Sequence, residues 1–382
     1  MSFAEADRAA LAAWLRLTLL PGVGGAGQRS LLKAFGTPEA VFEASAEALA
    51  SVLGPQLAQV VLSHPTESSV ATSLEWAADP RHHLLAIGDP RYPAALLELP
   101  DPPNLLYGKG SLAALGAPGL AIVGSRNATT GGLQTAERFA RALAERGFVI
   151  VSGLALGIDA AAHQGALAAG RAASTIAVIG TGIDRVYPAR NQALARRIVD
   201  EGGLILSEFA LGVGVQAHHF PRRNRLIAGL AKGVLVVEAA LESGSLITAR
   251  LAGEQGREVF AIPGSIHLPQ SRGCHRLIKD GAKLVETVTD ITDELDPASL
   301  LPAHLQAASE SDPSGGSTCK NPAATPLLGA AVLDGLGGDP LTLDQLTLRS
   351  GLTAERLLAM LFELELAGHV AALPGGRYQR LG

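Results

Sequence analysis

Short apolar runs alternate with longer amphipathic stretches across residues 84–296 of this 382-residue chain. The runs stand at 119–124, 148–153, 174–180, 204–208, 233–239 and 258–264. Such runs are typical of strands covered by helices on both faces, and the stretches between them have the period of helices. The alternation predicts right-handed βαβ units and an α/β fold with a doubly wound, mostly parallel sheet.

A helical pattern rich in Ala and Leu precedes this block and predicts a small helical domain over residues 1–83. Its segment LTLLPGVGGAGQRSLLKAFG predicts a helix ending at Pro21-Gly22, a glycine-rich hairpin, and a second helix over 28–35. The hairpin is either a helix–hairpin–helix whose glycine amides face a DNA phosphate, or a compact turn that needs glycine only for close packing.

Two further segments follow the central block. Pro, Ser, Gly and Ala dominate residues 297–325, which predict a flexible linker. Residues 326–382 predict three helices and a β-hairpin, the pattern of a winged helix. The third helix carries three glutamates against one arginine: Glu355, Glu363, Glu365 and Arg356. Because an acidic helix repels a phosphate backbone, we expect this domain to contact protein in preference to DNA bases.

Composition narrows the class of protein. Hydrophobic residues make up 47% of the chain and aromatic residues 4%, which favours tightly packed α/β layers. No apolar run is long enough to predict a membrane span, and the acidic Glu5 and Asp7 precede the first apolar segment, unlike a secretory signal. Cys274 and Cys319 are the only cysteines, too few for a disulfide framework or a thiolate metal site. We therefore expect a cytoplasmic protein with no metal and no cofactor.

One stretch of the chain is positively charged although the chain as a whole is acidic. The chain has a formal net charge of −5, yet the stretch HHFPRRNRLIAGL holds three arginines, Arg222, Arg223 and Arg225. No acidic residue lies between Glu208 and Glu238. We interpret the arginines as an uncompensated positive cluster for an anion, followed by a helix that starts near Arg225.

The segments after the predicted strands share this preference for anions. In an open parallel sheet, ligands bind outside the carboxyl ends of the strands. Glycine loops, hydroxyls and helix N-termini at that edge favour phosphate, and arginine adds bidentate contacts. The candidates outside the arginine stretch are Gly124, Ser125 and Arg126, then Ser152 and Gly153, then Ser243 and Gly244.

Common phosphate motifs are missing from these loops. The loop GSRNATTGG does not match G-x-G-x-x-G, and YGKGS does not match a Walker A loop, which disfavours dehydrogenases and NTPases. Asp159 and His163 lie four apart on one predicted helix. They are either an acid–base pair or structural hydrogen-bonding groups that fix the SGLALGID turn. His218 and His219 lack metal-ligand spacing, so we interpret them as loop residues near an anion.

Several long motifs in series resemble the bacterial DNA-processing protein family DprA, also called Smf. They are IVGSRNAT, VSGLALGIDAAAHQGAL, VIGTGIDRVYPARNQAL, LILSEF, HHFPRRNRLIAGL, VVEAALESGSLITARLAGEQGREVFAIPGS and SRGCHRLIKDGAKLV. The resemblance implies an extended Rossmann-like domain without a nucleotide cofactor, a small N-terminal helical domain (SAM-like or helix–hairpin–helix) and a C-terminal winged helix.

The resemblance also implies a function. Members of the family bind and protect single-stranded DNA, form homodimers through the Rossmann-like domain, and load the RecA recombinase onto incoming strands in natural transformation and recombination. These partners, and a single-strand-binding protein as a further one, are expected here, with no catalytic activity. The alternative is a nucleotide phosphoribohydrolase-like enzyme, for which Glu238 and Glu242 are candidates, although ESGSLITA lacks the paired glycines of such enzymes.

The family motifs assign residues for binding. Arg126 corresponds to the arginine of the GSR motif, and Phe220, Arg223, Asn224 and Arg225 to the HFPxRNR motif. Arg222 stands where the family varies, and adds positive charge. Phe220 is expected either to stack on a base or to plug the start of the helix, and Asn224 either to cap that helix or to contact the DNA backbone.

Overall fold

The computed structural model describes residues 3–295, together with residues 341–342, 345, 347, 357, 361, 370–373 and 377–380. The chain separates into two compact units, residues 1–311 and 312–382. The predicted linker over 297–325 lies outside the described residues.

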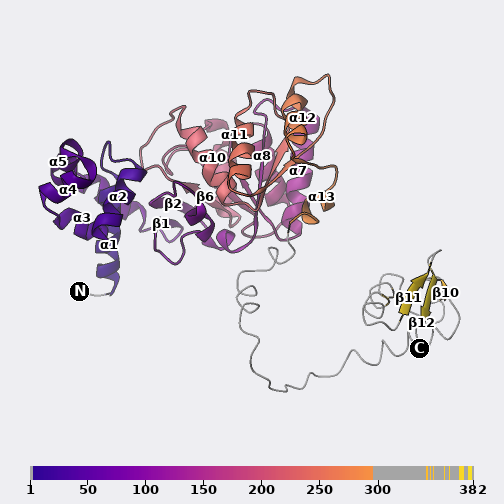
Figure 1. Ribbon diagram of the computed structural model, residues 1–382, viewed down its shortest axis with the longest axis horizontal. Coiled ribbons are helices and arrows are strands. Elements are labelled where there is room, and N and C mark those ends of the chain that lie inside the picture. The colour runs from indigo at the N-terminus through magenta and orange to yellow at the C-terminus, as the bar shows by residue number, and fades with distance from the viewer. Residues whose placement is uncertain are drawn as a thin grey trace, which may run out of the picture. The chain divides into compact units, whose positions relative to one another are not determined.

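A nine-stranded sheet forms the centre of the first unit (Figure 1). In spatial order its strands are β1 (His82–Ala86), β2 (Leu105–Gly110), β6 (Leu204–Ser207), β5 (Thr175–Val178), β4 (Val149–Ser152), β3 (Gly119–Gly124), β7 (Gly233–Val237), β8 (Glu258–Ala261) and β9 (Lys283–Leu284). Neighbouring strands from β6 to β9 are parallel, whereas β2 is antiparallel to both β1 and β6. The predicted doubly wound, mostly parallel sheet is confirmed; the antiparallel pair at its edge was not predicted.

Helices cover both faces of the sheet, as Figure 1 shows. They are α7 (Thr130–Glu145), α8 (Ile158–Ala168), α9 (Gln192–Asp200), α10 (His219–Gly229), α11 (Gly244–Glu254), α12 (Arg272–Lys279) and α13 (Thr289–Thr292). Ala121 and Val123 of β3 share one hydrophobic cluster with Leu226 of α10, while Leu120 and Ile122 share another with α7 and α8. Successive side chains of a strand point to opposite faces, so a strand buried on both needs a continuous apolar run.

From residue 3, where the described part begins, six helices precede the sheet: α1 (Phe3–Thr18), α2 (Gly25–Phe35), α3 (Pro38–Glu43), α4 (Ala46–Leu53), α5 (Pro55–Ser63) and α6 (Glu67–Trp76). Thr37 and Ser45 cap α3 and α4, since each side-chain oxygen accepts a hydrogen bond from the amide three residues later. The helices have a core of their own around Leu17 and Leu31. Leu15 of α1, however, belongs to a cluster with Leu84 of β1, so apolar packing continues past residue 83.

The glycine-rich hairpin between α1 and α2 packs against the chain that leads into β2. Gln28 is buried, donates to the carbonyl of Val23 at 2.8 Å and accepts from Nδ2 of Asn104 at 2.7 Å. Arg29 pairs with Asp101 and donates to the carbonyl of Pro102 at 3.0 Å. The first basic side chain after the hairpin is thus occupied within the protein, which favours the compact-turn interpretation.

In the second unit, the structure describes a three-stranded sheet in the order β10 (Leu341–Thr342), β12 (Arg377–Arg380), β11 (Val370–Leu373). β11 and β12 are antiparallel, with Val370 opposite Arg380, as the β-hairpin prediction requires. Leu357 and Leu361 are helical and buried, at the spacing of one helix turn. The three glutamates of the predicted third helix lie outside the described residues.

The order of the strands in the sheet indicates where a ligand site is expected. The chain fills the sheet from β3 to β6 in one direction and then crosses to β7 on the other side of β3. The loops after β3 and β7 therefore diverge from neighbouring strands at the topological switch point, where open α/β sheets bind ligands.

Candidate nucleic-acid interface

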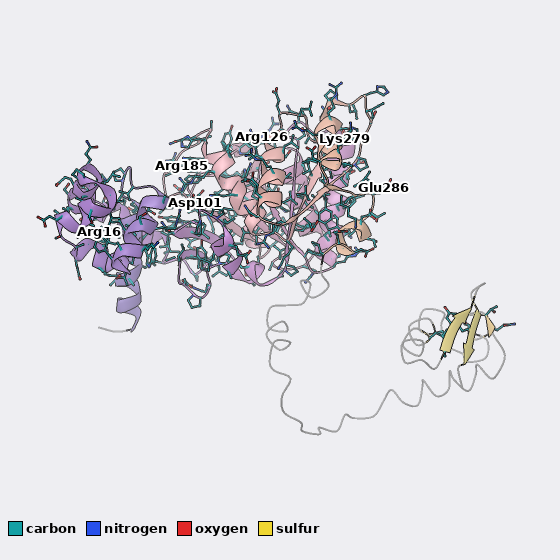
Figure 2. The ribbon with its side chains drawn as sticks, in the orientation of Figure 1. Arg16, Asp101, Arg126, Arg185, Lys279 and Glu286 are labelled. Atoms are coloured by element: carbon teal, nitrogen blue, oxygen red, sulfur yellow. The ribbon has the colours of Figure 1, made fainter. Side chains whose placement is uncertain are left out.

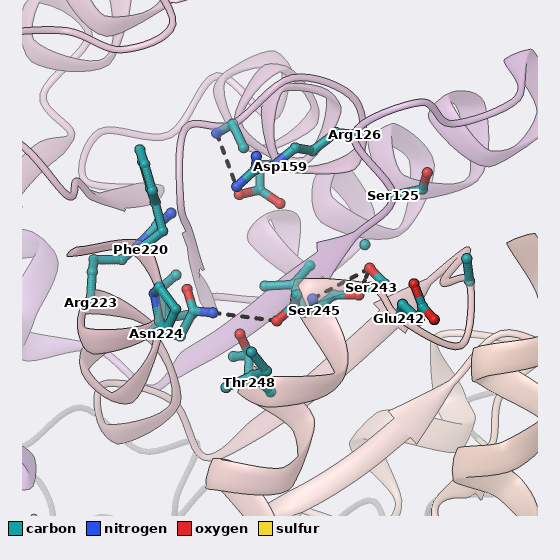
Figure 3. Close-up of a pocket in the computed structure, with 18 of the residues that line it drawn as sticks. Ser125, Arg126, Asp159, Phe220, Arg223, Asn224, Glu242, Ser243, Ser245 and Thr248 are labelled. Atoms are coloured by element: carbon teal, nitrogen blue, oxygen red, sulfur yellow. Dashed lines mark hydrogen bonds between the residues drawn. The ribbon is translucent and has the colours of Figure 1, made fainter. Parts of the chain in front are cut away.

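A cavity of 590 Å³ lies at this switch point, and we name it the central pocket (Figure 3). Its walls come from the loops after β3, β4 and β7 and from the first turns of α10 and α11. Side chains that line it include Arg126, Asp159, Phe220, Arg223, Ser243 and Thr248. The carboxyl edge predicted from the loop sequences is thus a concave site.

The loop after β3 is fixed by its own backbone. A Cβ on Gly124 would lie 1.9 Å from the carbonyl oxygen of Val237, so glycine is required where β3 and β7 approach. The amide of Ser125 donates to the carbonyl of Glu238 at 2.6 Å, and its carbonyl accepts from the amide of Ile158 at 3.1 Å. These contacts to two neighbouring segments hold the loop that carries Arg126.

Arg126 is exposed at the mouth of the pocket, and its guanidinium carbon lies 5.6 Å from the ring centroid of Phe220. Within residues 3–295 it makes no ion pair or hydrogen bond. Phe220 is half-buried, and its ring lies beside Gly180, where an added Cβ would sit 3.2 Å from Cδ1. A free guanidinium next to a partly exposed aromatic ring suits a phosphate and a neighbouring base.

Arg223 forms the buried floor of the pocket. It is 4% exposed and its Nη1 donates to the carbonyl of Val178 at 2.6 Å. A Cβ on Gly153 would lie 1.8 Å from that Nη1, so the absent side chain makes room for the guanidinium. The hydroxyl of Ser152 is fully buried and donates to the carbonyl of Ile122 at 2.6 Å. Ser152 therefore ties β4 to β3 and does not line the pocket.

Asp159 lies opposite Arg223 in the same buried region. Its Oδ2 accepts from the amides of Gly153 at 3.1 Å and Ala155 at 3.4 Å, which fixes the turn after β4. Burial raises the pKa of Asp159, and the charge of Arg223 opposes this shift. Burial also lowers the pKa of Arg223 to about 10, so the guanidinium stays charged at neutral pH.

Asp159 and His163 do not form an acid–base pair. His163 is fully buried and its Nδ1 lies 2.7 Å from Oγ1 of Thr175. That hydroxyl donates to the carbonyl of Ile150 at 2.7 Å, so Nδ1 of His163 is the donor to it. Burial, followed by the charge of Arg223, lowers the pKa of His163 to about 3. Of the two interpretations, the structural one is supported.

The helix that carries the arginines begins earlier than predicted. α10 starts at His219, not near Arg225, so Asn224 is inside the helix and its role as a cap is excluded. Pro221 is compatible with the first helical turn, because an amide there has no intrahelical acceptor. Asn224 instead donates from Nδ2 to the carbonyl of Gly244 at 3.3 Å, which joins α10 to the start of α11.

Helical geometry divides the arginines between two faces of α10. Phe220 and Arg223 line the central pocket, whereas Arg222 and Arg225 line a second cavity of 320 Å³ beside the N-terminal hairpin. There Arg225 pairs with Glu208, and Nη2 of Arg222 lies 3.2 Å from the same carboxylate oxygen of Glu208. The interpretation of an uncompensated cluster is wrong, because Glu208, at the border of the acid-free stretch, folds back beneath it.

This ion cluster is nearly closed to solvent. The side chain of Glu208 is 2% exposed and that of Arg225 is 12% exposed. Burial raises the pKa of Glu208, and Arg225 and then Arg222 oppose that shift. Arg225 also lies 3.8 Å from Asp101, the partner of Arg29. Arg225 is therefore committed to carboxylates, while Arg222, with its side chain 46% exposed, keeps access to solvent.

The N-terminus of α11 forms the opposite wall. Ser243 is its N-cap, and its Oγ lies 2.7 Å from Oγ of Ser245 and accepts from that residue's amide at 3.4 Å. Gly244 is exposed at the first helical position. The partial positive charge of a helix N-terminus thus adds to Arg126 and Arg223 at one cavity.

The two glutamates considered for catalysis occupy different settings. Glu238 accepts from the amide of Thr129 at 2.8 Å and from its hydroxyl at 2.5 Å, so it anchors the start of α7. Glu242 is exposed and lines the central pocket.

His219, interpreted from the sequence as a loop residue near an anion, lies inside α10. It is buried, stacks on Phe209 at 4.0 Å and has its Nδ1 3.2 Å from the carbonyl oxygen of Gly180, so it is a structural residue of α10.

Sequence reasoning missed two residues beside the pocket. The ring of Tyr187 lies 5.7 Å from that of Phe220 and is 46% exposed. Asn191 is buried and its Nδ2 donates to the carbonyls of Leu154 at 2.9 Å and Ala155 at 3.0 Å. The sequence YPARN in the loop after β5 was the signal that could have identified them. It contains an aromatic residue and an amide, whereas the other loops at this edge of the sheet are rich in small residues.

The described parts of the chain contain no group of three or more His, Cys, Asp or Glu side chains placed to hold a metal ion. None of the helices described there is both long and apolar enough to cross a membrane.

Comparisons with known proteins match both units. A family model described as DNA recombination-mediator protein A matches residues 83–296, and a model of the DprA winged helix domain matches residues 319–376. Protein Smf of Escherichia coli is 44% identical over 325 residues, which cover 85% of this chain and 84% of that protein.

Two solved structures are similar to this chain. The X-ray structure of DNA processing protein A from Streptococcus pneumoniae is 39% identical, with a TM-score of 0.65, over 73% of this chain and 96% of that one. A structure of DNA processing protein A from Helicobacter pylori, described by its single-stranded DNA binding mode, is 32% identical with a TM-score of 0.51, over 56% of this chain and 94% of that one.

Proposed function

Because this chain belongs to the DprA (Smf) family of DNA recombination mediators, we propose that it binds single-stranded DNA at the central pocket without selecting a base sequence. The observation that carries the proposal is Arg126, an exposed guanidinium without an ion pair in residues 3–295, set beside the ring of Phe220. The Helicobacter pylori relative, described as a single-stranded DNA binder, supports this choice of ligand.

The groups at the central pocket are better suited to bind the sugar–phosphate backbone of DNA than the edge of a particular base. Arg126, Arg223 and the first turn of α11 offer positive charge and N–H donors, which bind phosphate whatever the base. Phe220 offers a ring face, and every base has a π-face that stacks on it. Gly124, Ser125, Asn224 and Gly244 also line the pocket and shape the walls. Gly153 acts beneath them by accommodating Arg223.

Arg126→Ala tests the proposal. We expect weaker binding of a labelled oligothymidine in fluorescence anisotropy, and a log–log salt slope lower by roughly 0.7, the value for one lost phosphate contact on a single strand. Arg138→Ala is the matched control, since Arg138 is an exposed arginine on α7, with no ion pair in residues 3–295. An Arg126→Ala protein with intact circular dichroism, unchanged affinity and unchanged slope would exclude the central pocket as the binding site.

We further propose that the protein hands bound strands to the RecA recombinase in the cytoplasm, in natural transformation and recombination, and that it catalyses no reaction itself. Family membership supports the transfer role, with a single-strand-binding protein as a further partner. The anchoring of Glu238 by Thr129 supports the non-catalytic role, because that carboxylate is already occupied. Release of ribose or base from nucleoside monophosphates by the purified protein would contradict it.

We also propose a homodimer through the Rossmann-like domain. Three large apolar side chains are exposed in the loops after β7 and β8: Leu241 at 49%, Ile266 at 73% and Leu268 at 41%. The strands are neighbours, and the amide of Gly273 on α12 donates to the carbonyl of Ala239 at 2.7 Å, which holds the two segments together. We name Leu241, Ile266 and Leu268 the apolar patch, because large apolar side chains exposed on neighbouring loops are candidates for an association site.

A further inference from the structure

An exposed aromatic ring continues the central pocket on its outer side. Tyr187 is 46% exposed, whereas Tyr92 and Tyr107 are buried. Within residues 3–295 the hydroxyl of Tyr187 makes no hydrogen bond. Its ring centroid lies 5.7 Å from that of Phe220, with 44° between the ring planes. Phe220 therefore has two neighbours, the guanidinium of Arg126 at 5.6 Å and the ring of Tyr187.

The loop that carries Tyr187 is held at both ends. Before it, Oγ1 of Thr181 donates to the carbonyl of Arg185 at 2.6 Å, and the amide of Arg185 donates to the carbonyl of Gly182 at 2.9 Å. After it, Asn191 donates to the carbonyls of Leu154 and Ala155 in the turn below the central pocket. Tyr187 is thus presented to solvent on a fixed support that is tied to the pocket.

We propose that Tyr187 is a second stacking position, which takes a nucleobase of the single strand next to the one bound at Phe220. This inference rests on the proposed binding of single-stranded DNA. A base inserted between the two rings would need about 6.8 Å, twice the spacing of roughly 3.4 Å between stacked bases. The rings are closer than that and tilted, so the base stacks on the solvent-facing side of Tyr187.

Positive charge continues along the same path. Arg185 and Arg190 flank Tyr187 and are exposed, and Arg190 has no ion pair within residues 3–295. Arg185 keeps a loose pair with its neighbour Asp184 at 3.8 Å. Figure 2 shows Arg185 and Arg126 along the same edge of the domain. The strand therefore leaves the central pocket over Phe220 and Tyr187, toward the loop after β5, with its phosphates near these arginines.

Tyr187→Ala and Tyr187→Phe separate stacking from other contributions. We expect Tyr187→Ala to weaken oligothymidine binding by about fivefold or more, the lower end of what one stacked base contributes. The salt slope should stay unchanged because no phosphate contact is lost, and Tyr187→Phe should bind like the unmodified protein. Leu97→Ala is the control: Leu97 is 51% exposed in the 3₁₀ helix over Ala94–Glu98, whose Leu96 packs on Gly229 at the C-terminal end of α10, and no residue of this 3₁₀ helix lines the central pocket.

An oligonucleotide with one abasic position, moved along its length, locates the stacked base. In the unmodified protein a base removed from the Tyr187 position weakens binding, and in Tyr187→Ala the same removal has no further effect. If the unmodified protein does not bind single strands, the proposed function fails. If it binds them, and Tyr187→Ala shows the same affinity and the same abasic profile, the stacking position is overturned and the proposed function stands.

Discussion

Glu208 and Arg225 form a buried ion pair on the face of α10 that is turned away from the central pocket. The pair joins the end of β6 to the middle of α10, and Arg222 adds a second contact to the same carboxylate. A helix that presents positive charge at a ligand site is thereby held in place by a carboxylate behind it.

Arg225→Met should lower stability without changing the salt dependence of DNA binding. Removing one partner of a buried pair leaves an uncompensated charge, and because Arg222 remains near Glu208 we expect a loss of about 2 to 3 kcal/mol in the free energy of unfolding. Urea denaturation followed by circular dichroism measures it. Glu208→Gln added to Arg225→Met removes the stranded charge and should recover part of the loss. A lower salt slope in Arg225→Met would instead place Arg225 on the DNA.

Gly153→Ala should disturb the floor of the central pocket. The new methyl group collides with Nη1 of Arg223, which has to give up its hydrogen bond to Val178. We expect a loss of about 1 to 3 kcal/mol in the free energy of unfolding, typical of overpacking, together with weaker DNA binding. Gly244→Ala is the control for stability, since a Cβ there meets nothing within 4 Å. Equal stability of the two variants would show that Arg223 moves aside freely.

His163 should make stability depend on pH. Its pKa in the folded protein is about 3, far below the usual value of about 6.5 that applies to the unfolded chain. Between these two pKa values His163 is protonated in the unfolded chain and neutral in the folded protein. The contribution of neutral His163 to the free energy of unfolding is therefore complete above pH 6.5 and is lost as the pH falls toward 3. The slope reaches at most about 1.4 kcal/mol for each pH unit.

His163→Asn keeps a donor toward Thr175 and removes the titrating group. Denaturation between pH 6.5 and 5, where few carboxylates titrate, should show a shallower decline in the free energy of unfolding than in the unmodified protein. Parallel declines in the two proteins would mean that His163 is not the group responsible.

The apolar patch should control the oligomeric state. Ile266→Glu places a charge at its most exposed side chain and should convert a dimer to a monomer at micromolar concentration, as measured by multi-angle light scattering. Leu97→Glu introduces the same charge outside the patch and should leave the dimer intact. A dimer that persists in Ile266→Glu would move the interface to another surface.

The sequence predicted the parallel strands because a strand covered on both faces has to be apolar throughout, a property visible in one dimension. It did not predict β1 and β2, since this antiparallel pair lacks a crossover helix and the alternation that such helices impose. It placed Arg126, Phe220 and Arg223 correctly at one edge of the sheet. It did not separate Arg222 and Arg225 from them, because Pro221 concealed the true start of α10 and therefore the direction of each side chain.

Other errors have a spatial origin. Glu208 precedes the acid-free stretch in the chain but lies beneath it in the fold, so a count along the sequence cannot register the compensation. The exposure of Tyr187 depends on how the loop after β5 is held by hydrogen bonds from Thr181 and Asn191. The sequence of the loop does not reveal these hydrogen bonds. The domain boundary between residues 83 and 84 stays a prediction, and the sequence did not indicate that Leu15 and Leu84 pack in one hydrophobic cluster across it.

The hydrophobic cluster that contains Leu15 and Leu84 determines where the chain can be truncated without exposing apolar surface. β1 is the outermost strand of the sheet, α1 packs on β1 and β2, and Trp76 stacks on His82 at 4.2 Å. A fragment that began at residue 84 would lose α1 and the first two residues of β1. The removed residues His82 and His83 pair with Lys109 and Gly108 of β2, and the removed Leu15 packs in one cluster with Leu105 and Tyr107. Open edges and bared apolar faces cause chains to stick to one another. A truncated protein would then self-associate for reasons created by the cut, and a genuine dimer is recognisable only in the intact chain.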